Sequence, residues 1–205
     1  MICVVWNARG LGNERASHEL QRLIAKKSMS FIFLCETKLR DFSCKRWKDV
    51  LGFFGLFVVN YEGRSGGLIL LWKKILNVTI NYFTAGNIDS TMQHGEKIWR
   101  FTGFYETFGG NPRPLSQTRA FREVLNASSL HDLHVEGEVF TWVNRRASPN
   151  VIFEGIDRYV ATFEWRLLYP AERVQTLEFY HSDHRPILLE LGGPQQIRAR
   201  NLPSL

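Results

Sequence analysis

The sequence lacks the long apolar runs that a membrane-spanning helix needs. Its longest apolar stretches, such as residues 67–72, are far shorter than the roughly 18 residues required to cross a bilayer. The apolar run at the N-terminus, residues 2–6, is followed closely by Arg9. We therefore expect neither a membrane span nor a signal peptide.

Cysteine is also scarce, and the few cysteines do not form a pattern. Cys3, Cys35 and Cys44 are odd in number and form no Cys-x-x-Cys pair. This pattern argues against a disulfide scaffold and a cysteine-rich zinc site, and it favours a reducing, intracellular compartment. The sequence also has no His-x-x-x-His pair and no Gly-x-Ser-x-Gly element, so the corresponding zinc sites and serine hydrolases are excluded.

What remains is the composition of an ordinary globular protein. The chain has 205 residues, of which 44% are hydrophobic and 22% are charged. This length predicts one domain, or at most two small ones. We expect a single domain over residues 1–191, the extent of the family resemblance given below, with a flexible tail over residues 192–205 and a monomeric state. The formal net charge of +6 permits a polyanionic partner without requiring one.

Apolar periodicity predicts interspersed strands and helices, which is typical of a layered α/β fold. Predicted helices cover residues 14–27, 42–51, 118–130 and 163–168, with Asn13 capping the first. Predicted strands cover residues 2–6, 31–35, 56–60, 67–72, 77–84, 97–105, 139–143, 174–179 and 186–191. Phe121, Val124, Leu125 and Ser128 are predicted to line the inner face of the third helix.

Polar residues follow the first two predicted strands directly. Asn7 ends the first strand and Glu36 ends the second. If these strands are neighbours, an amide and a carboxylate face one site, a combination that suits a hard cation such as Mg²⁺. Taken alone, each residue is a weak signal, and an ordinary polar strand end is the simpler interpretation.

The run Ser182-Asp183-His184 precedes the last predicted strand. Adjacent side chains of an extended chain alternate in direction, so Asp183 and His184 share a site only if the backbone turns there. His184 would then need a second carboxylate to fix its tautomer, and Asp157 is a candidate. A simple turn before a strand is the alternative.

The glycine-rich run around Arg64 and Ser65 resembles a phosphate cradle, although a tight turn is the simpler interpretation. It is not a P-loop, because a strand follows it where a helix is required. Basic pairs such as Arg145-Arg146 could contact phosphates, although a solvated surface explains them equally well.

Taken in order, these pieces resemble the endonuclease/exonuclease/phosphatase superfamily. The close resemblance is to the endonuclease domain of plant non-LTR (LINE-type) retrotransposon polyproteins, which is similar to apurinic/apyrimidinic endonucleases, and it covers residues 1–191. The motifs that carry it are Trp6-Asn7-Ala-Arg9-Gly10-Leu-Gly12, Phe33-Leu34-Cys35-Glu36-Thr37-Lys38, Gly63-Arg64-Ser65-Gly66-Gly67-Leu68, Trp99-Arg100-Phe101-Thr102-Gly103-Phe104-Tyr105, Phe140-Thr141-Trp142, Ile156-Asp157-Arg158 and Ser182-Asp183-His184-Arg185-Pro186.

The resemblance implies a four-layer α/β sandwich that hydrolyses phosphate esters, DNA phosphodiesters in particular, with Mg²⁺ or Mn²⁺. By the same resemblance, Glu36 is the principal metal ligand and Asn7 its neighbour. Tyr105 would lie near the scissile phosphate, and Asp183 would assist at the metal or the water. Asp157 would orient His184, which would offset negative charge on the phosphate. A nuclear location also follows from the resemblance.

One family motif is absent. In the family, the strand ending at the position of Tyr105 is followed by a helix and a core strand that ends in Gly-Asp-Phe-Asn, whose Asp activates the attacking water. Here the chain runs from Tyr105 into residues 106–114 and the next helix without that motif. We therefore expect one core strand and a helix to be missing, and catalysis to be impaired. A non-catalytic remnant with weak nucleic-acid affinity and a phosphatase of small phosphorylated molecules are the alternatives.

Overall fold

The computed structural model describes residues 1–12, 14–63, 66–105, 115–146, 148–178 and 182–192. Its centre is a seven-stranded sheet, accompanied by a three-stranded sheet and two short two-stranded pairs. The order of the large sheet is β3-β4-β2-β1-β14-β13-β9. Its strands are β1 (Ile2–Asn7), β2 (Phe31–Cys35), β3 (Gly55–Val59), β4 (Leu68–Trp72), β9 (Val135–Glu136), β13 (Glu172–Thr176) and β14 (Ile187–Leu191).

The smaller sheet has the order β5-β6-β7, built from β5 (Asn77–Phe83), β6 (Asn87–His94) and β7 (Lys97–Phe104). The short pairs join β8 (His131–Asp132) to β12 (Val160–Ala161) and β10 (Trp142–Val143) to β11 (Phe153–Glu154). The helices are α1 (Glu14–Lys26), α2 (Asp41–Val50), α3 (Leu115–Ala127) and α4 (Phe163–Leu168). None of these helices, in the part of the chain that is described, has the length and apolar character needed to span a bilayer.

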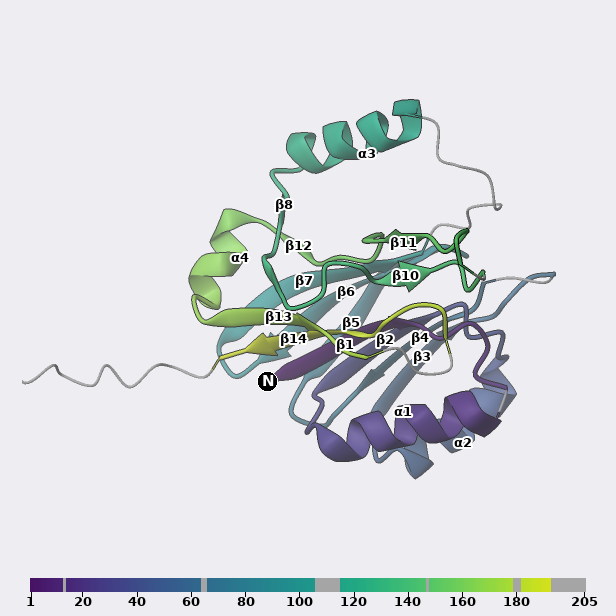
Figure 1. Ribbon diagram of the computed structural model, residues 1–205. Helices are drawn as coiled ribbons and strands as arrows, with labels where there is room; N and C mark the ends of the chain where they lie inside the picture. Colours follow the sequence, from purple (N-terminus) through teal and green to yellow (C-terminus); the bar gives the residue numbers. More distant parts are fainter. Residues whose placement is uncertain (13, 64–65, 106–114, 147, 179–181, 193–205) are drawn as a thin grey trace, which may run out of the picture.

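The large sheet separates two hydrophobic cores, because the side chains of a strand alternate between its two faces. On one face Trp6 and Leu34 pack with Leu20 of α1 and with Cys44 of α2. On the other face Phe33 belongs to a cluster that includes residues of the three-stranded sheet, among them Met92 and Trp99. Figure 1 shows the resulting layers, with α1 and α2 on one side and α3 on the opposite side of the molecule.

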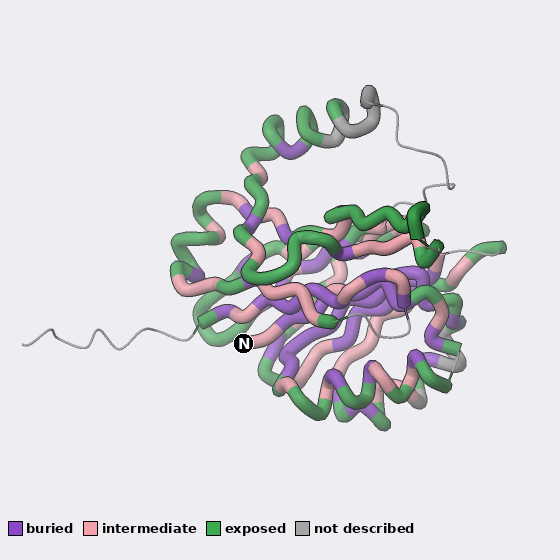
Figure 2. The backbone as a smooth tube through the Cα atoms, in the orientation of Figure 1, coloured by how far each residue is buried: buried purple, intermediate pink, exposed green. Residues whose placement is uncertain are grey.

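Burial is concentrated in the large sheet (Figure 2). All five residues of β2 are buried, whereas β5 contains no buried residue. The apolar runs that predicted strands over residues 2–6 and 31–35 are confirmed, and these strands form the middle of the large sheet. Cys3, Cys35 and Cys44 are free and buried.

Several predicted details are wrong. The predicted strand over residues 139–143 forms only at Trp142 and Val143, where it pairs with β11. The strand expected over residues 174–179 is instead Glu172–Thr176. β6 was not predicted at all, because its sequence has no apolar alternation; it forms between β5 and β7, which supply partners for its backbone on both sides.

The third helix is the other departure. Val124 was expected on its inner face, but its side chain is 61% exposed, and Ser128 is exposed as well. Leu125 is buried as predicted. The side chain of Phe121, the predicted cap Asn13 and residues 193–205 of the predicted tail lie outside the described residues.

Candidate active site

Three segments of the chain meet at one edge of the large sheet. β1 and β2 are parallel, with Asn7 opposite Cys35, so Asn7 and Glu36 come to the same edge. β14 runs antiparallel to β1 and starts with Ile187 opposite Val5, so the residues just before it reach that edge as well. The neighbouring strands that the candidate site required are therefore present.

His184 lies between two of the predicted site residues. Its Nδ1 is 2.8 Å from Oδ2 of Asp157, and its Nε2 is 3.3 Å from Nδ2 of Asn7. His184 is 6% exposed and Asn7 is 4% exposed. The three side chains thus form a line that joins residues far apart in the sequence, with Asn7 and His184 buried and Asp157 partly buried.

The direction of each bond in this line follows from its neighbours. Oδ1 of Asn7 accepts a hydrogen bond from the backbone N–H of Arg9 at 3.2 Å, so the amide nitrogen faces the imidazole. The carboxylate of Asp157 can only accept, so Nδ1 of His184 carries the proton that it receives. In the neutral imidazole Nε2 is then an acceptor for the Asn7 amide.

Hydrogen bonds between side chains and the backbone fix the turn that carries His184. The hydroxyl of Ser182 donates to the carbonyl oxygen of Asn7 at 2.6 Å and accepts from the backbone N–H of His184 at 3.0 Å. Nε1–H of Trp6 donates to the carbonyl oxygen of His184 at 3.1 Å. The backbone therefore turns at Ser182, which is the condition for Asp183 and His184 to share one site.

A second cluster adjoins the first and contains the other two carboxylates. Arg9 Nη1 is 2.8 Å from Oδ2 of Asp183, and Arg9 Nε is 3.3 Å from Oε2 of Glu36. Nε1–H of Trp142 donates to the same Oδ2 of Asp183 at 3.1 Å. Oδ1 of Asp183 is buried and has no hydrogen-bond partner among the described residues.

Glu36 is held by an unusual backbone loop. Glu36 and Lys38 have φ values of 52° and 53°, in the left-handed region that costs energy for residues with a Cβ. The loop persists because the backbone N–H of Gly10 donates to the Glu36 carbonyl oxygen at 2.8 Å and that of Thr37 donates to the Gly67 carbonyl oxygen at 3.1 Å. The carboxylate is thus presented by a backbone that is pinned on both sides.

Tyr105 completes this cluster. Burial raises the pKa of its hydroxyl, and the negative charge of Glu36 together with a hydrogen bond to Glu36 raises that pKa further. The hydroxyl therefore stays protonated and donates to the Glu36 carboxylate. Arg64 and Ser65, the predicted phosphate contacts, lie outside the described residues.

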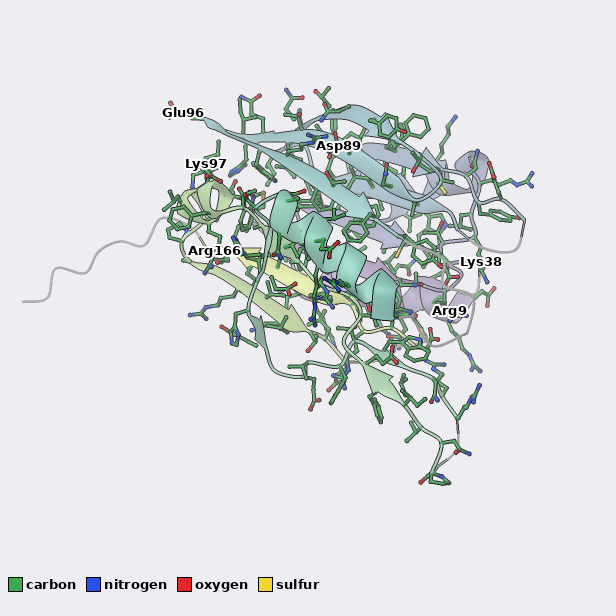
Figure 3. All side chains as sticks on the ribbon, turned by 90° about the horizontal axis from the view of Figure 1, so that it is seen from above. Arg9, Lys38, Asp89, Glu96, Lys97 and Arg166 are labelled. Carbon is green, nitrogen blue, oxygen red and sulfur yellow. The ribbon has the colours of Figure 1, made fainter. Side chains whose placement is uncertain are left out.

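Figure 3 places Arg9 and Lys38 together at one end of the molecule, opposite the end that holds Glu96 and Lys97. The site is therefore confined to one end of the sandwich. Its partly exposed cation, Arg9, has 46% of its side chain accessible to solvent.

No protein-family model and no curated protein sequence gives a significant match to the chain, whereas solved structures do. The endonuclease domain of TRAS1, a telomere-specific non-LTR retrotransposon, has a TM-score of 0.64 at 16% identity, covering 95% of this chain and 99% of that one. The AP endonuclease LMAP of Leishmania major has a TM-score of 0.70 at 12% identity, covering 94% and 88%. The 3'-5' exonuclease NExo of Neisseria meningitidis has 0.66 at 16% identity, covering 93% and 99%.

The chain has the endonuclease/exonuclease/phosphatase fold. The α/β sandwich expected from the sequence is thereby confirmed. At these identities the similarity establishes the fold, and the chemistry of the site has to be argued from this chain's own residues.

On this endonuclease/exonuclease/phosphatase scaffold, four side chains that sequence reasoning had given no role support the site. Arg9, Ser182 and Trp142 contact the predicted residues as described above. The hydroxyl of Thr141 accepts from the backbone N–H of Asp157 at 2.9 Å and of Ile156 at 3.1 Å, and so fixes the loop that carries Asp157. The signal that could have found them is their place inside the quoted motifs, next to the residues that were chosen.

The donor set fits a hard divalent cation in part. Oxygen atoms of Glu36, Asp183 and Asn7 are the donors that Mg²⁺ prefers, and Oδ1 of Asp183 is a buried oxygen without a hydrogen-bond partner. Within the described ranges, no three His, Cys, Asp or Glu side chains gather closely enough to hold a metal by themselves. Mg²⁺ usually keeps several waters and takes only one or two protein carboxylates, so such a set suffices.

Proposed function

We propose that this chain is an endonuclease-like domain of the non-LTR retrotransposon type, built for Mg²⁺-dependent hydrolysis of DNA phosphodiesters and working at a reduced rate. The observation that carries the proposal is the hydrogen-bonded line Asp157–His184–Asn7 beside the cluster of Glu36, Asp183 and Arg9. An oriented imidazole next to paired carboxylates is an arrangement suited to phosphoryl chemistry.

In this proposal Glu36 and Asp183 hold the cation, with Asn7 beside them. A bound Mg²⁺ supplies charge stabilisation to a phosphoryl oxygen. Asp157 holds the proton on Nδ1 of His184 and fixes the plane of the ring. A phosphate entering the site takes the place of the Asn7 amide at Nε2, and the ring donates to it from Nε2 after taking up a second proton from solvent. In this proposal Tyr105, protonated and hydrogen-bonded to Glu36, lies beside the phosphate that enters the site.

The reduced rate follows from the carboxylates that are present. Asp157 is engaged by His184, Glu36 by Arg9 and Tyr105, and one oxygen of Asp183 by Arg9 and Trp142. Among the described residues, no other Asp or Glu side chain contacts His184, Arg9, Trp142 or Tyr105 in the hydrogen bonds and ion pairs given for this site. The Gly-Asp-Phe-Asn motif, whose Asp would activate the water, is absent from the sequence. Loss of a positioned general base typically costs about 10²–10⁴-fold in rate.

The three-stranded sheet and α3, which we call the thin side of the sandwich, support the proposed internal deletion. The sheet that contains β7 has three strands in the described part of the chain, and Leu125 is the one buried side chain among those described on α3. A strand and helix missing after Tyr105 would leave this appearance. Origin in a plant LINE-type element, a nuclear location, a single domain over residues 1–191 and a monomeric state belong to the same proposal and rest on the ordered motifs.

DNA is the proposed partner. Among structures with this fold, TDP2 of D. rerio was solved with a single-stranded DNA product, at a TM-score of 0.66 and 15% identity over 92% of this chain and 97% of that one. Arg145 and Arg146 follow β10 close to the site, and Arg145 donates to the carbonyl oxygen of Ser182 at 2.6 Å. These side chains can contact the phosphate backbone.

Nicking of supercoiled plasmid in the presence of Mg²⁺ tests the proposal. The comparison is wild type against Glu36→Gln, with Glu190→Gln as a matched control at the far end of β14. We expect slow Mg²⁺-dependent nicking that Glu36→Gln abolishes and Glu190→Gln retains. Mn²⁺ should substitute for Mg²⁺.

Two other outcomes would favour the alternatives. Salt-sensitive DNA binding by folded protein without any cleavage would favour a non-catalytic remnant. Hydrolysis of a soluble phosphomonoester but not of DNA would favour a phosphatase. Either result would contradict the proposed nuclease activity.

A further inference from the structure

Arg9 is placed where it joins two carboxylates that come from different segments. Its guanidinium lies 3.3 Å from Oε2 of Glu36 and 2.8 Å from Oδ2 of Asp183. The two acidic side chains are only 10% and 15% exposed, whereas Arg9 is 46% exposed. The cation therefore comes from the solvent side and covers carboxylates that are mostly buried.

The backbone of Arg9 is fixed although its side chain reaches solvent. Its φ is 43°, its N–H donates to Oδ1 of Asn7 at 3.2 Å, and the next residue, Gly10, donates to the carbonyl oxygen of Glu36 at 2.8 Å. The guanidinium is thus tethered at the edge of the site by a rigid turn. Because several side-chain torsions separate it from that turn, it can leave the carboxylates without moving the backbone.

Charge balance explains why a guanidinium should lie there. Two largely buried carboxylates close to one cation repel each other when that cation is removed, and burial makes such repulsion stronger than in water. The guanidinium of Arg9 forms an ion pair with each of them. Arg9 is therefore the counter-ion of this pair.

Resting on the proposed function, we propose that Arg9 is an internal counter-ion that a divalent cation must displace, and that the displaced guanidinium then binds a phosphate of the DNA. Both cations depend on the negative charge of the same two carboxylates, Glu36 and Asp183, so they compete for them. Once the ion neutralises the carboxylates, the guanidinium at the mouth of the site is free to form the paired hydrogen bonds that arginine makes with phosphate. Cation and DNA then strengthen each other's binding through Arg9.

Binding of Mn²⁺ in the absence of DNA, followed by electron paramagnetic resonance of the free ion, measures the competition. The variants are Arg9→Gln, which removes the charge, and Arg9→Lys, which keeps the charge but cannot contact Glu36 and Asp183 through two separate nitrogen atoms. Arg22→Gln is the matched control, since Arg22 lies on α1 and pairs with Glu19. We expect Arg9→Gln to bind Mn²⁺ about five- to tenfold more tightly than wild type, Arg9→Lys to fall between them, and Arg22→Gln to match wild type.

Two further readouts separate this role from a structural one. Without metal, Arg9→Gln should melt at a lower temperature than wild type, and saturating Mn²⁺ should remove that difference. Fluorescence anisotropy of a short DNA duplex should show that Mn²⁺ tightens DNA binding by wild type more than by Arg9→Gln. Arg9→Lys retains the positive charge and serves as the reference if Arg9→Gln folds poorly.

Equal or weaker Mn²⁺ binding by both Arg9 variants would overturn the inference, even if the wild type nicks DNA. Absence of Mn²⁺ binding by folded wild type and folded variants alike would overturn the proposed metal dependence, and the inference with it. The first result leaves the proposed function standing, whereas the second does not.

Discussion

The two sheets of this protein differ in how completely they are covered. The seven-stranded sheet has an apolar core on each face, one shared with α1 and α2 and one shared with the smaller sheet. The three-stranded sheet buries residues such as Ile88 and Met92 on one face, while β5 has no fully buried residue. The large sheet positions Asn7, Glu36 and His184 of the candidate site, whereas Tyr105 follows β7 of the smaller sheet.

This difference between the sheets indicates which substitutions should lower the free energy of unfolding and where the proposed loss of catalytic residues lies. Asn7, Glu36 and His184 follow or precede strands whose packing is complete on both faces. The internal deletion that we propose lies after Tyr105, on the side of the smaller sheet. Changes in the large sheet should therefore cost folding free energy, and changes near α3 should cost little.

The largest effect is expected at Phe33, which lies between the sheets. It is 1% exposed, its ring lies edge-on to Phe101 at 6.0 Å between centroids, and it covers Gly103. Phe33→Ala should lower the free energy of unfolding by about 3–5 kcal/mol, measured by chemical denaturation. Phe163→Ala, at a position 64% exposed, should change it by less than about 0.5 kcal/mol. Similar losses in both variants would contradict the account.

Gly67 tests the loop that presents Glu36. Its φ is +86°, and an added Cβ would lie 2.7 Å from Oγ1 of Thr37 and 3.1 Å from the backbone N of Lys38. Gly67→Ala should destabilise by about 1 kcal/mol for the backbone conformation and a further 1–3 kcal/mol for the contacts. Thermal unfolding measures both.

Gly95→Ala is the control, because Gly95 has a φ of +60° and nothing within 4 Å of an added Cβ. It should show the backbone cost alone. If the two variants unfold at the same temperature, the tight contact with Thr37 and Lys38 does not constrain the loop.

Much of the fold could be predicted because its central strands are short, continuous apolar runs in the sequence. The run Phe31–Cys35 is buried at every position, so a plain apolar stretch predicted it. β6 could not be found, because Asp89 and Gln93 give it no apolar pattern and the two adjacent strands define it. Val124 was misplaced since helical spacing predicts a face but does not show whether anything covers it.

The site was predicted less completely than the fold. Strand ends and one adjacent pair led to Asn7, Glu36, Asp157 and His184, and the structure places these side chains at one edge. The position of Arg9 between Glu36 and Asp183 could not be predicted, because it depends on how two loops meet. Spacing in the sequence holds no information about such a meeting.

Asp89 of β6 allows the stability of the smaller sheet to be tested through its dependence on pH. Burial alone would raise the pKa of Asp89, but hydrogen bonds from Arg100, Thr102 and Asn81 lower it below its usual value. A lowered pKa in the folded state means stability that is present above the unfolded pKa of about 3.9 and is lost as pH falls through the folded value.

Asp89→Asn should therefore lower the free energy of unfolding by about 1–3 kcal/mol at neutral pH, with a smaller difference from wild type below about pH 4. Urea unfolding across this pH range measures it. A difference that is constant with pH would mean that the charge of Asp89 does not stabilise the sheet.

The smallest effect is expected on α3. Val124 is 61% exposed, so Val124→Ser should change the free energy of unfolding by less than about 0.5 kcal/mol in urea. Leu20→Ala on α1, where the side chain is fully buried, should cost about 2–5 kcal/mol. A loss above about 1 kcal/mol for Val124→Ser would indicate that α3 is covered in solution.

The most direct test of the proposed site is a double-variant comparison of plasmid nicking in Mg²⁺. If Asp157 acts only by orienting His184, then Asp157→Asn and His184→Asn remove one function between them. The account predicts that the double variant nicks no more slowly than His184→Asn alone, while His94→Asn on the distant end of β6 nicks like wild type. The account would be contradicted if the double variant lost as much nicking rate as the product of the two single losses. A His184→Asn variant that nicks as fast as wild type would also contradict it.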